Sequence, residues 1–245
     1  MRTFLCGKGG GCANVLRAMV GRYDQIVVYS PDPGMQAAAD EMGVSWTEES
    51  INQWHLWSCQ PDLIVSVGCL EIMTPAVIEM VDGRVINCHY ALLPNHRGRS
   101  SVPWAILDGD TVTGVTWHWI DASIDTGRVL LQATCQIERD ETQGSLFGKL
   151  DRLAGEYYAA AAWLAAIKHA GVIQRGRTQY HRAGPPHGGV IDPTWRDDYI
   201  ERFIRAMTHP PLAYATFDGR EVRTFADYER LRREYAARDH CYADA

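Results

Sequence analysis

Short apolar runs alternate with amphipathic stretches through the first hundred residues of the chain. Runs such as residues 63–67 are typical of strands buried on both faces of a parallel sheet. Because helical segments separate the runs, the alternation predicts a doubly wound α/β sheet. Strands are predicted at residues 3–6, 26–29, 63–67 and from 85 onwards, and helices around 15–19, at 35–42 and 49–59, after Pro75 and from Ser101.

The pattern changes after Gly109, where longer strands and one long helix replace the short units. Strands are predicted at residues 113–120 and 128–138, with a turn between them. Residues 143–170 predict a helix that ends at Gly171. Its apolar side chains recur at helical spacing and indicate core packing: Leu146, Leu150, Leu153, Tyr157, Leu164 and Ile167.

Residues 184–189 are rich in glycine and proline, which is typical of a linker. Beyond them the pattern predicts a helix near residues 198–207, two short strands around Asp218-Gly219 and a charged final helix. We therefore predict two domains, a large one at residues 1–183 and a small α+β module at residues 184–245.

Composition limits the possible functions. The 245 residues are 46% hydrophobic and 22% charged, with a net charge of −6, which argues against a general affinity for nucleic acid. No apolar run approaches the roughly 18 residues that cross a membrane. The seven cysteines are scattered without a C-x-x-C pair, so neither a disulfide framework nor a zinc or other metal site is predicted. A reducing cytoplasm is the expected compartment.

A glycine-rich turn, residues 7–11, lies between the first strand and the first helix. Backbone N–H groups at a helix N-terminus suit an anion, and Lys8 would add a positive charge. The dinucleotide pattern G-x-G-x-x-G fails, because Cys12 stands where the third glycine belongs. Anion binding and a simple tight turn both remain open here.

Asn87 and His89 stand one residue apart at the end of the strand that begins at Val85. Alternate side chains of a strand point to the same face, so an amide and an imidazole are predicted side by side. The carboxyl ends of strands are where ligands sit in open α/β sheets. A structural alternative is a turn with a hydrogen-bonded histidine.

Three motifs occur in order: Asn-Cys-His at residues 87–89, L-L-P-x-x-R-G at 92–98 and Ile-Asp-Thr-Gly at 124–127. Together they resemble the folate-dependent formyltransferases, over roughly residues 1–170. The resemblance implies a catalytic trio of Asn87, His89 and Asp125. It also implies a Rossmann-like core with a mixed, mostly parallel sheet and a small C-terminal α+β module.

The C-terminal part, at residues 180–192 and 203–215, looks like the sugar N-formyltransferases, which act on nucleotide-linked amino sugars. The implied reaction transfers a formyl group from N10-formyltetrahydrofolate to the sugar amine, without a metal. The expected acceptor is dTDP-4-amino-4,6-dideoxyglucose, with GDP-linked 4-amino sugars and 3-amino isomers next, and a homodimer is expected. The implied folate contacts are Leu70, Glu71, Ile72, Asp121 and Ile124, and the candidate substrate contacts are Lys8, Gly9, Gly10, Arg97 and Tyr180.

Two other functions compete with this interpretation. A nicotinamide-binding oxidoreductase would use the glycine-rich turn for the dinucleotide and Asp32 for its ribose. That hypothesis leaves Asn87, His89 and Asp125 without a shared role. The other alternative is a nucleotide-sugar binder that lacks catalysis, against which the intact trio argues.

Overall fold

The computed structural model describes residues 1–53 and 60–243, with side chains to residue 237. The chain forms two compact units, of which the first comprises residues 1–98, 113–135 and 148–180, and the second the remainder. The second unit thus includes residues 99–112 and 136–147 as well as the tail. Division into independent domains at residue 184 stays a prediction. Within the described residues no helix is both long and apolar enough to cross a membrane.

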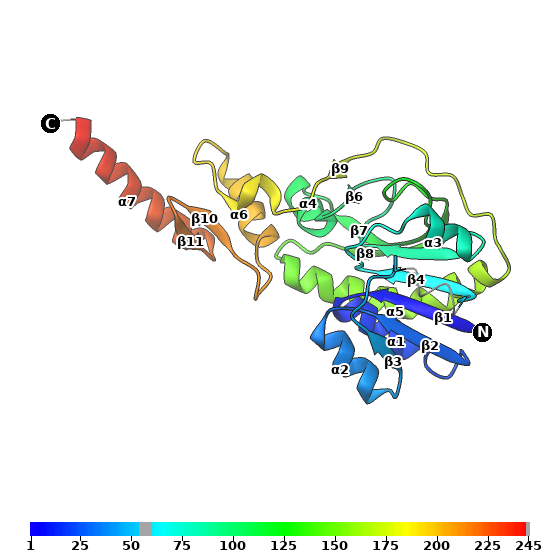
Figure 1. Ribbon diagram of the computed structural model, residues 1–245. Coiled ribbons are helices and arrows are strands. Elements are labelled where there is room, and N and C mark those ends of the chain that lie inside the picture. Colours follow the sequence, from blue (N-terminus) through cyan, green and yellow to red (C-terminus); the bar gives the residue numbers. More distant parts are fainter. Residues whose placement is uncertain (54–59, 244–245) are drawn as a thin grey trace. The chain divides into compact units, whose positions relative to one another are not determined.

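A seven-stranded sheet forms the centre of the first unit, in the order β3-β2-β1-β4-β5-β7-β8 (Figure 1). The first five strands in this order pair in parallel, and β5 pairs with β7 in antiparallel fashion. The predicted mixed, mostly parallel sheet is therefore confirmed. The strands are β1 (Arg2–Gly7), β2 (Gln25–Tyr29), β3 (Ser45–Thr47), β4 (Leu63–Val67), β5 (Val85–His89), β7 (Val112–Trp119) and β8 (Val129–Gln136), with the short β6 (Arg97–Gly98) outside the sheet.

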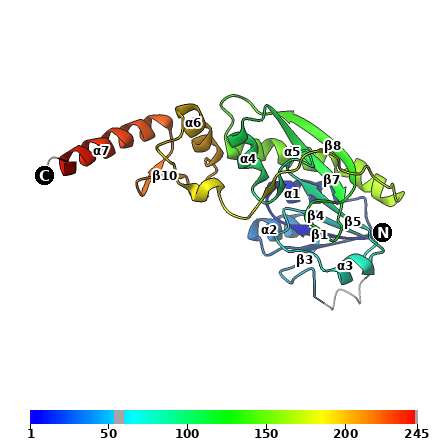
Figure 2. The ribbon, with the colours of Figure 1, turned by 90° about the horizontal axis from the view of Figure 1, so that it is seen from above.

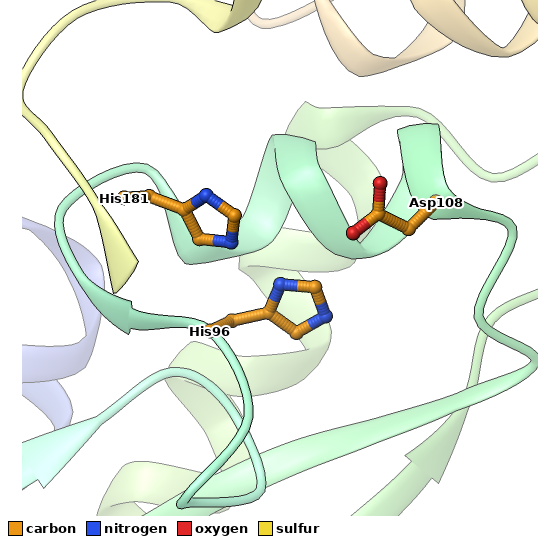
Figure 3. Close-up of side chains that lie close together, drawn as sticks. All are labelled: His96, Asp108 and His181. Atoms are coloured by element: carbon orange, nitrogen blue, oxygen red, sulfur yellow. The ribbon is translucent and has the colours of Figure 1, made fainter. Parts of the chain in front are cut away.

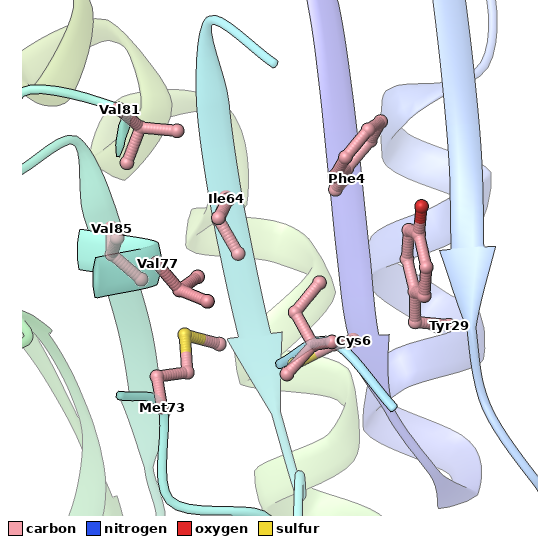
Figure 4. Packing of buried hydrophobic residues seen from close by; sticks show 9 residues of the cluster. Phe4, Cys6, Tyr29, Ile64, Met73, Val77, Val81 and Val85 are labelled. Carbon is pink, nitrogen blue, oxygen red and sulfur yellow. The ribbon is translucent and has the colours of Figure 1, made fainter. Parts of the chain in front are cut away.

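Helices cover both faces of this sheet. In Figure 2, α1 and α5 lie on one side of it and α3 on the other. On the α3 side, residues of β1, β2, β4 and β5 form one apolar cluster with the loop and helix that follow β4, and Figure 4 shows Ile64 and Val85 beside Met73 and Val77. The helices are α1 (Gly9–Met19), α2 (Pro33–Glu41), α3 (Pro75–Met80) and α5 (Gln143–Ala166).

Local sequence explains where these helices begin. Asp32 caps α2, because its side chain accepts a hydrogen bond from the Gly34 N–H. Pro33 and Pro75 occupy the first turns of α2 and α3, where their missing N–H costs no hydrogen bond. The α2 segment is followed by Gly43 in the left-handed region, at a φ of 65°, as the predicted helix stop requires.

Three local predictions are wrong. The glycines at positions 9–11 form the first turn of α1 rather than a flexible loop before it. Residues 49–53 are not helical, and the remainder of the helix predicted at 49–59 lies outside the described residues. Helix α5 ends at Ala166, four residues early, because Lys168 takes a left-handed conformation with a φ of 52°.

The buried face of α5 also differs from the predicted stripe. Leu146 and Leu150 are buried, whereas Tyr157 and Ile167 are exposed on 37% and 52% of their surface. Small alanines let the helix approach the sheet closely, so the buried face continues through residues that a search for large apolar side chains passes over. These residues are Ala154, Ala161 and Ala165, and the large side chain of Tyr158, which the predicted stripe omits, is buried among them in sequence.

The second unit contains helices packed on one another and a hairpin. Arg202 of α6 donates to the Leu107 carbonyl of α4 over 3.0 Å. Trp104 of α4 stacks on the His181 ring at 4.7 Å, and Figure 3 labels His181 and Asp108 in this region. The elements are α4 (Ser101–Asp108), β9 (Tyr180–His181, which begins in the first unit), the 3₁₀ turn η2 (Pro186–Gly189), α6 (Asp197–Ala206), β10 (Ala215–Phe217), β11 (Arg220–Val222) and α7 (Phe225–Ala243).

Candidate functional site

The side chains of Asn87 and His118 meet where β5 pairs with β7. The antiparallel register places them directly opposite each other, so they share one face of the sheet. The Asn87 amide Nδ2 lies 3.1 Å from His118 Nε2. His118 Nδ1 lies 2.8 Å from the Trp119 carbonyl, to which it donates. These two contacts assign the tautomer of His118, in which Nε2 accepts from the amide.

His89 is buried two residues further along β5, with 8% of its surface exposed. Its Nε2 donates to the His96 carbonyl over 2.8 Å, and its Nδ1 lies 3.4 Å from Asp125 Oδ2. Burial lowers the pKa of His89, and the Asp125 carboxylate and the His96 carbonyl only partly offset this effect. The imidazole is therefore mainly neutral near neutral pH, with its basic Nδ1 turned toward Asp125.

Asp125 comes from the loop between β7 and β8 and has a left-handed backbone, with a φ of 53°. Its Oδ2 accepts from the Gly98 N–H over 2.8 Å, and its Oδ1 lies 3.6 Å from His118 Nε2. Burial acts to raise the pKa of Asp125, but the two imidazoles and the Gly98 N–H lower it to about 2. The carboxylate is thus charged across the physiological range.

Gln174 holds the Asp125 loop through two hydrogen bonds. The Gln174 amide nitrogen donates to the carbonyls of Asp125 and Gly127, over 2.9 and 2.8 Å. Position 127 requires glycine, because a Cβ there would lie 1.7 Å from the Trp119 carbonyl oxygen. The Gly127 backbone therefore packs directly on the end of β7, which fixes the carboxylate near both imidazoles.

This arrangement brings together a neutral amide donor, a neutral imidazole and a fixed carboxylate. Such a set suits acyl transfer, in which the amide stabilises an oxyanion and the imidazole accepts a proton. A family model described as formyl transferase matches residues 31–162, more than half of the chain and all four residues of the cluster. The chain belongs to the formyl transferase family.

Curated relatives of this formyl transferase include enzymes for two kinds of acceptor. This chain is 34% identical over 164 residues to the GDP-perosamine N-formyltransferase of Brucella melitensis, and the alignment covers 65% of this chain and 62% of the relative. It is 30% identical over 188 residues to a methionyl-tRNA formyltransferase of Agathobacter rectalis, covering 73% and 58%. The chain therefore spans less than two thirds of the length of either relative.

Solved structures show the same fold at lower identity. An N-formyltransferase from Helicobacter canadensis, solved with folinic acid and dTDP-3-aminofucose, matches with a TM-score of 0.76 and 18% identity, covering 90% of this chain and 86% of that one. A 4-N formyltransferase from Francisella tularensis matches with a TM-score of 0.74 and 17% identity, covering 88% and 91%. These likenesses establish a formyltransferase fold for the chain.

The residues predicted to contact folate fall into two groups in this formyl transferase. Leu70, Ile72 and Ile124 expose 53%, 73% and 41% of their surface, so they are available to a ligand. Glu71 is hydrogen-bonded to the Ser50 hydroxyl. Asp121 shapes its own loop by accepting a 2.6 Å hydrogen bond from the Thr126 hydroxyl. Folate contact by all five predicted residues stays a prediction.

The geometry does not favour a phosphate at the N-terminus of α1. The Gly9 N–H donates to Asp32 Oδ2 over 2.9 Å. A Cβ on Gly10 would lie 2.4 Å from Asp151 Oδ2, so a second carboxylate presses against the same helix turn. Two carboxylates of the chain itself thus lie at the helix N-terminus where an anion was expected, beside Lys8. Substrate contact at these three positions stays a prediction, and Asp32 is engaged in capping rather than open to a ribose.

The two remaining candidate substrate residues lie in different surroundings. Arg97 donates through Nε and Nη2 to the Gln174 side-chain oxygen, over 3.1 and 2.6 Å. Since Gln174 holds the Asp125 loop, the two Arg97 hydrogen bonds to Gln174 stabilise that loop indirectly. Tyr180 exposes 54% of its surface. Substrate contact by Arg97 and Tyr180 stays a prediction.

Sequence reasoning missed three contributors to the site: His118, the His96 carbonyl and Gln174. A signal was available for His118, because a histidine inside an apolar strand predicts either a core hydrogen bond or a functional role. The other two act through a backbone carbonyl and a clamp on a distant loop. Their roles depend on tertiary contacts that residue types do not reveal.

Proposed function

We propose that this protein transfers the formyl group of N10-formyltetrahydrofolate to the amino group of a nucleotide-linked amino-deoxy sugar. The observation that carries the proposal is the convergence of Asn87, His89 and Asp125 in a chain of the formyl transferase family. The choice of acceptor class is supported by sugar N-formyltransferases among the relatives and among the solved structures with the same fold.

Asn87 would stabilise the charge that develops on the formyl oxygen during attack by the amine. An amide nitrogen carries two N–H groups, and His118 accepts only one of them. The second remains for the oxyanion. A donor of this kind contributes about 3–4 kcal/mol to transition-state stabilisation. His118 fixes the amide, because an amide bonded on one side has fewer orientations to lose when the formyl group arrives.

His89 would accept the proton that the attacking amine releases and pass it to N10 of the folate as the bond between N10 and the formyl carbon breaks, so that tetrahydrofolate leaves. Its Nε2 is committed to the His96 carbonyl, so Nδ1 is the basic atom. The 3.4 Å separation of Nδ1 and Asp125 Oδ2 lets both atoms face one substrate N–H group. Asp125 then stabilises the imidazolium and the ammonium-like nitrogen of the amine. Its carboxylate is already ionised, since its pKa is about 2.

The exposed apolar side chains of Leu70, Ile72 and Ile124 are the proposed contacts for the flat pterin ring of the folate. Burying them under a ring would recover apolar surface that now faces water, at about 25 cal/mol per Å². For the acceptor we propose dTDP-4-amino-4,6-dideoxyglucose first and a GDP-linked 4-amino sugar such as GDP-perosamine second. The homodimer and the cytoplasmic location expected from the sequence stay predictions.

The decisive experiment incubates the full chain with N10-formyltetrahydrofolate and a panel of acceptors. The panel contains dTDP- and GDP-linked 4-amino sugars, a dTDP-linked 3-amino sugar and methionyl-tRNA. Mass spectrometry follows the formylated product, and absorbance follows tetrahydrofolate. We expect formylation of one nucleotide sugar and its loss in His89→Ala. Product on methionyl-tRNA alone would contradict the proposed acceptor class and leave the formyl transfer intact.

Ligand binding separates the competing functions. A thermal-shift panel of NADH, a folate analogue and several nucleotide sugars should show stabilisation by the last two and none by NADH. Stabilisation by NADH alone would support the oxidoreductase. A protein that binds nucleotide sugar but forms no product with any folate donor would be a binder without catalysis, and the proposal would fail.

A further inference from the structure

A pocket of about 230 Å³ lies in the first unit, at the end of the sheet away from His89. Three segments line it: residues 82–84 before β5, Trp119 at the end of β7, and residues 168–170 after α5. Because β5 and β7 are antiparallel, with Ile86 paired to Trp119, the pocket lies beside the start of β5. The candidate formyl-transfer site lies beside its last residues.

The walls of this pocket are held by backbone hydrogen bonds. The N–H groups of Asp82 and Gly83 donate to the carbonyls of Glu79 and Ile78, each over 2.9 Å. The Lys168 and His169 N–H groups likewise donate to the last turn of α5. Asp82 and Lys168 both have left-handed backbones, with φ values of 55° and 52°. Such conformations persist only where neighbouring contacts enforce them, so both walls are preorganised.

The lining offers hydrogen-bond donors around one aromatic ring. The indole N–H of Trp119 donates to the His169 carbonyl over 3.0 Å, and the Trp119 ring is the aromatic part of the pocket lining. His169 Nδ1 accepts from the Gly171 N–H over 3.0 Å, which leaves the proton on Nε2 as a donor. Arg84 uses Nε to bind the Val81 carbonyl over 3.0 Å. Within the described chain, no hydrogen bond engages its two terminal nitrogens.

Lys168 and Asp82 form an ion pair of 2.9 Å across the mouth of the pocket. Their side chains are 65% and 74% exposed, so the pair contributes little to stability and can exchange partners. The lining therefore holds two cations, Arg84 and Lys168, against one carboxylate, in a chain with a net charge of −6. An incoming anion would replace Asp82 at the lysine.

We propose that this pocket binds a small molecule in which a phosphate monoester or a carboxylate is attached to a flat ring. The arginine fork and the lysine would bind the oxyanion, with the His169 Nε2–H as a third donor. The ring would pack against Trp119. This site is separate from the Asn87–His89–Asp125 cluster and does not depend on the proposed formyl transfer.

Calorimetry on the full chain with phenyl phosphate, benzoate and inorganic phosphate tests the site. We expect saturable binding of phenyl phosphate or benzoate, and whichever binds more tightly identifies the oxyanion. Arg84→Gln should weaken that binding at least about tenfold, as expected when one charged hydrogen bond is lost. Arg152→Gln, an exposed arginine of α5 outside the pocket, should leave it unchanged.

Thermal unfolding of both variants checks that each remains folded, and the Trp119 indole N–H resonance, assigned with Trp119→Phe, reports occupancy of the pocket. Three results would overturn the proposal. They are no saturable binding of any probe, equal affinity in folded Arg84→Gln, and loss of binding in Arg97→Gln but not in Arg84→Gln. Inorganic phosphate binding as tightly as phenyl phosphate would overturn the ring contact.

Discussion

Replacing Asp125 by asparagine keeps the shape of the side chain and removes its charge. In the folded protein the pKa of this carboxyl is lowered from 3.8 to about 2. At about 1.4 kcal/mol for each tenfold change in proton affinity, the surroundings favour the charged form by about 2 kcal/mol. Asp125→Asn should therefore lower the free energy of unfolding by about that amount near neutral pH.

The sign of the pH dependence follows from the lowered pKa. The stabilisation is complete above the unfolded value of 3.8 and is lost as the pH falls through about 2. The difference between wild type and Asp125→Asn should therefore shrink steadily below about pH 4. Urea unfolding at a series of pH values measures it. Asp40→Asn is the matched control, because it removes an exposed carboxylate that accepts a hydrogen bond from the Trp46 indole N–H.

The same variant tests the catalytic role. Without the anion the pKa of His89 falls further, so the acidic limb of the kcat profile should move to lower pH while kcat itself decreases. A variant with wild-type stability near neutral pH and an unchanged kcat profile would refute the reasoning. Asp125 would then be a turn residue, and its short distance to His89 would have no functional meaning.

Three further results are expected. Asn87→Ala and His89→Ala should each lower kcat at least about a hundredfold with little change in KM. The double variant should have a kcat barely lower than either single variant, and near-normal turnover in His89→Asn would contradict the role of His89. His118→Phe should lower kcat up to about tenfold because Asn87 loses its acceptor, and His118→Gln should retain more of the activity. A smaller loss in His118→Phe than in His118→Gln would mean that ring packing matters and the hydrogen bond does not. Gly11→Ala should lower the free energy of unfolding, measured with urea, by about 1–3 kcal/mol, because its Cβ would lie 1.7 Å from the Tyr90 hydroxyl. Adding Tyr90→Phe should restore part of that loss, and an unshifted unfolding midpoint in Gly11→Ala would exclude the clash.

Local pattern predicted most of the elements of the first unit correctly. The run at residues 63–67 is a fully buried strand, as its apolar composition required. The predictions failed where a local signal had two solutions. Glycines at residues 9–11 are compatible with a loop, but here they allow α1 to start against Asp151 and Tyr90. A stripe of large side chains marked α5, yet alanines form much of its buried face.

The sequence by itself determined the fold class, the family resemblance and the three residues that meet in the candidate site. These depend on residue order along the chain: periodicity for the strands, and the resemblance of three motifs to a known family for Asn87, His89 and Asp125. Tertiary structure alone decided how each of them is held. His89 is oriented by the His96 carbonyl, and Asn87 by a histidine on an antiparallel neighbour strand. Such contacts join positions far apart in the chain through backbone atoms and strand register, and residue types alone do not predict them.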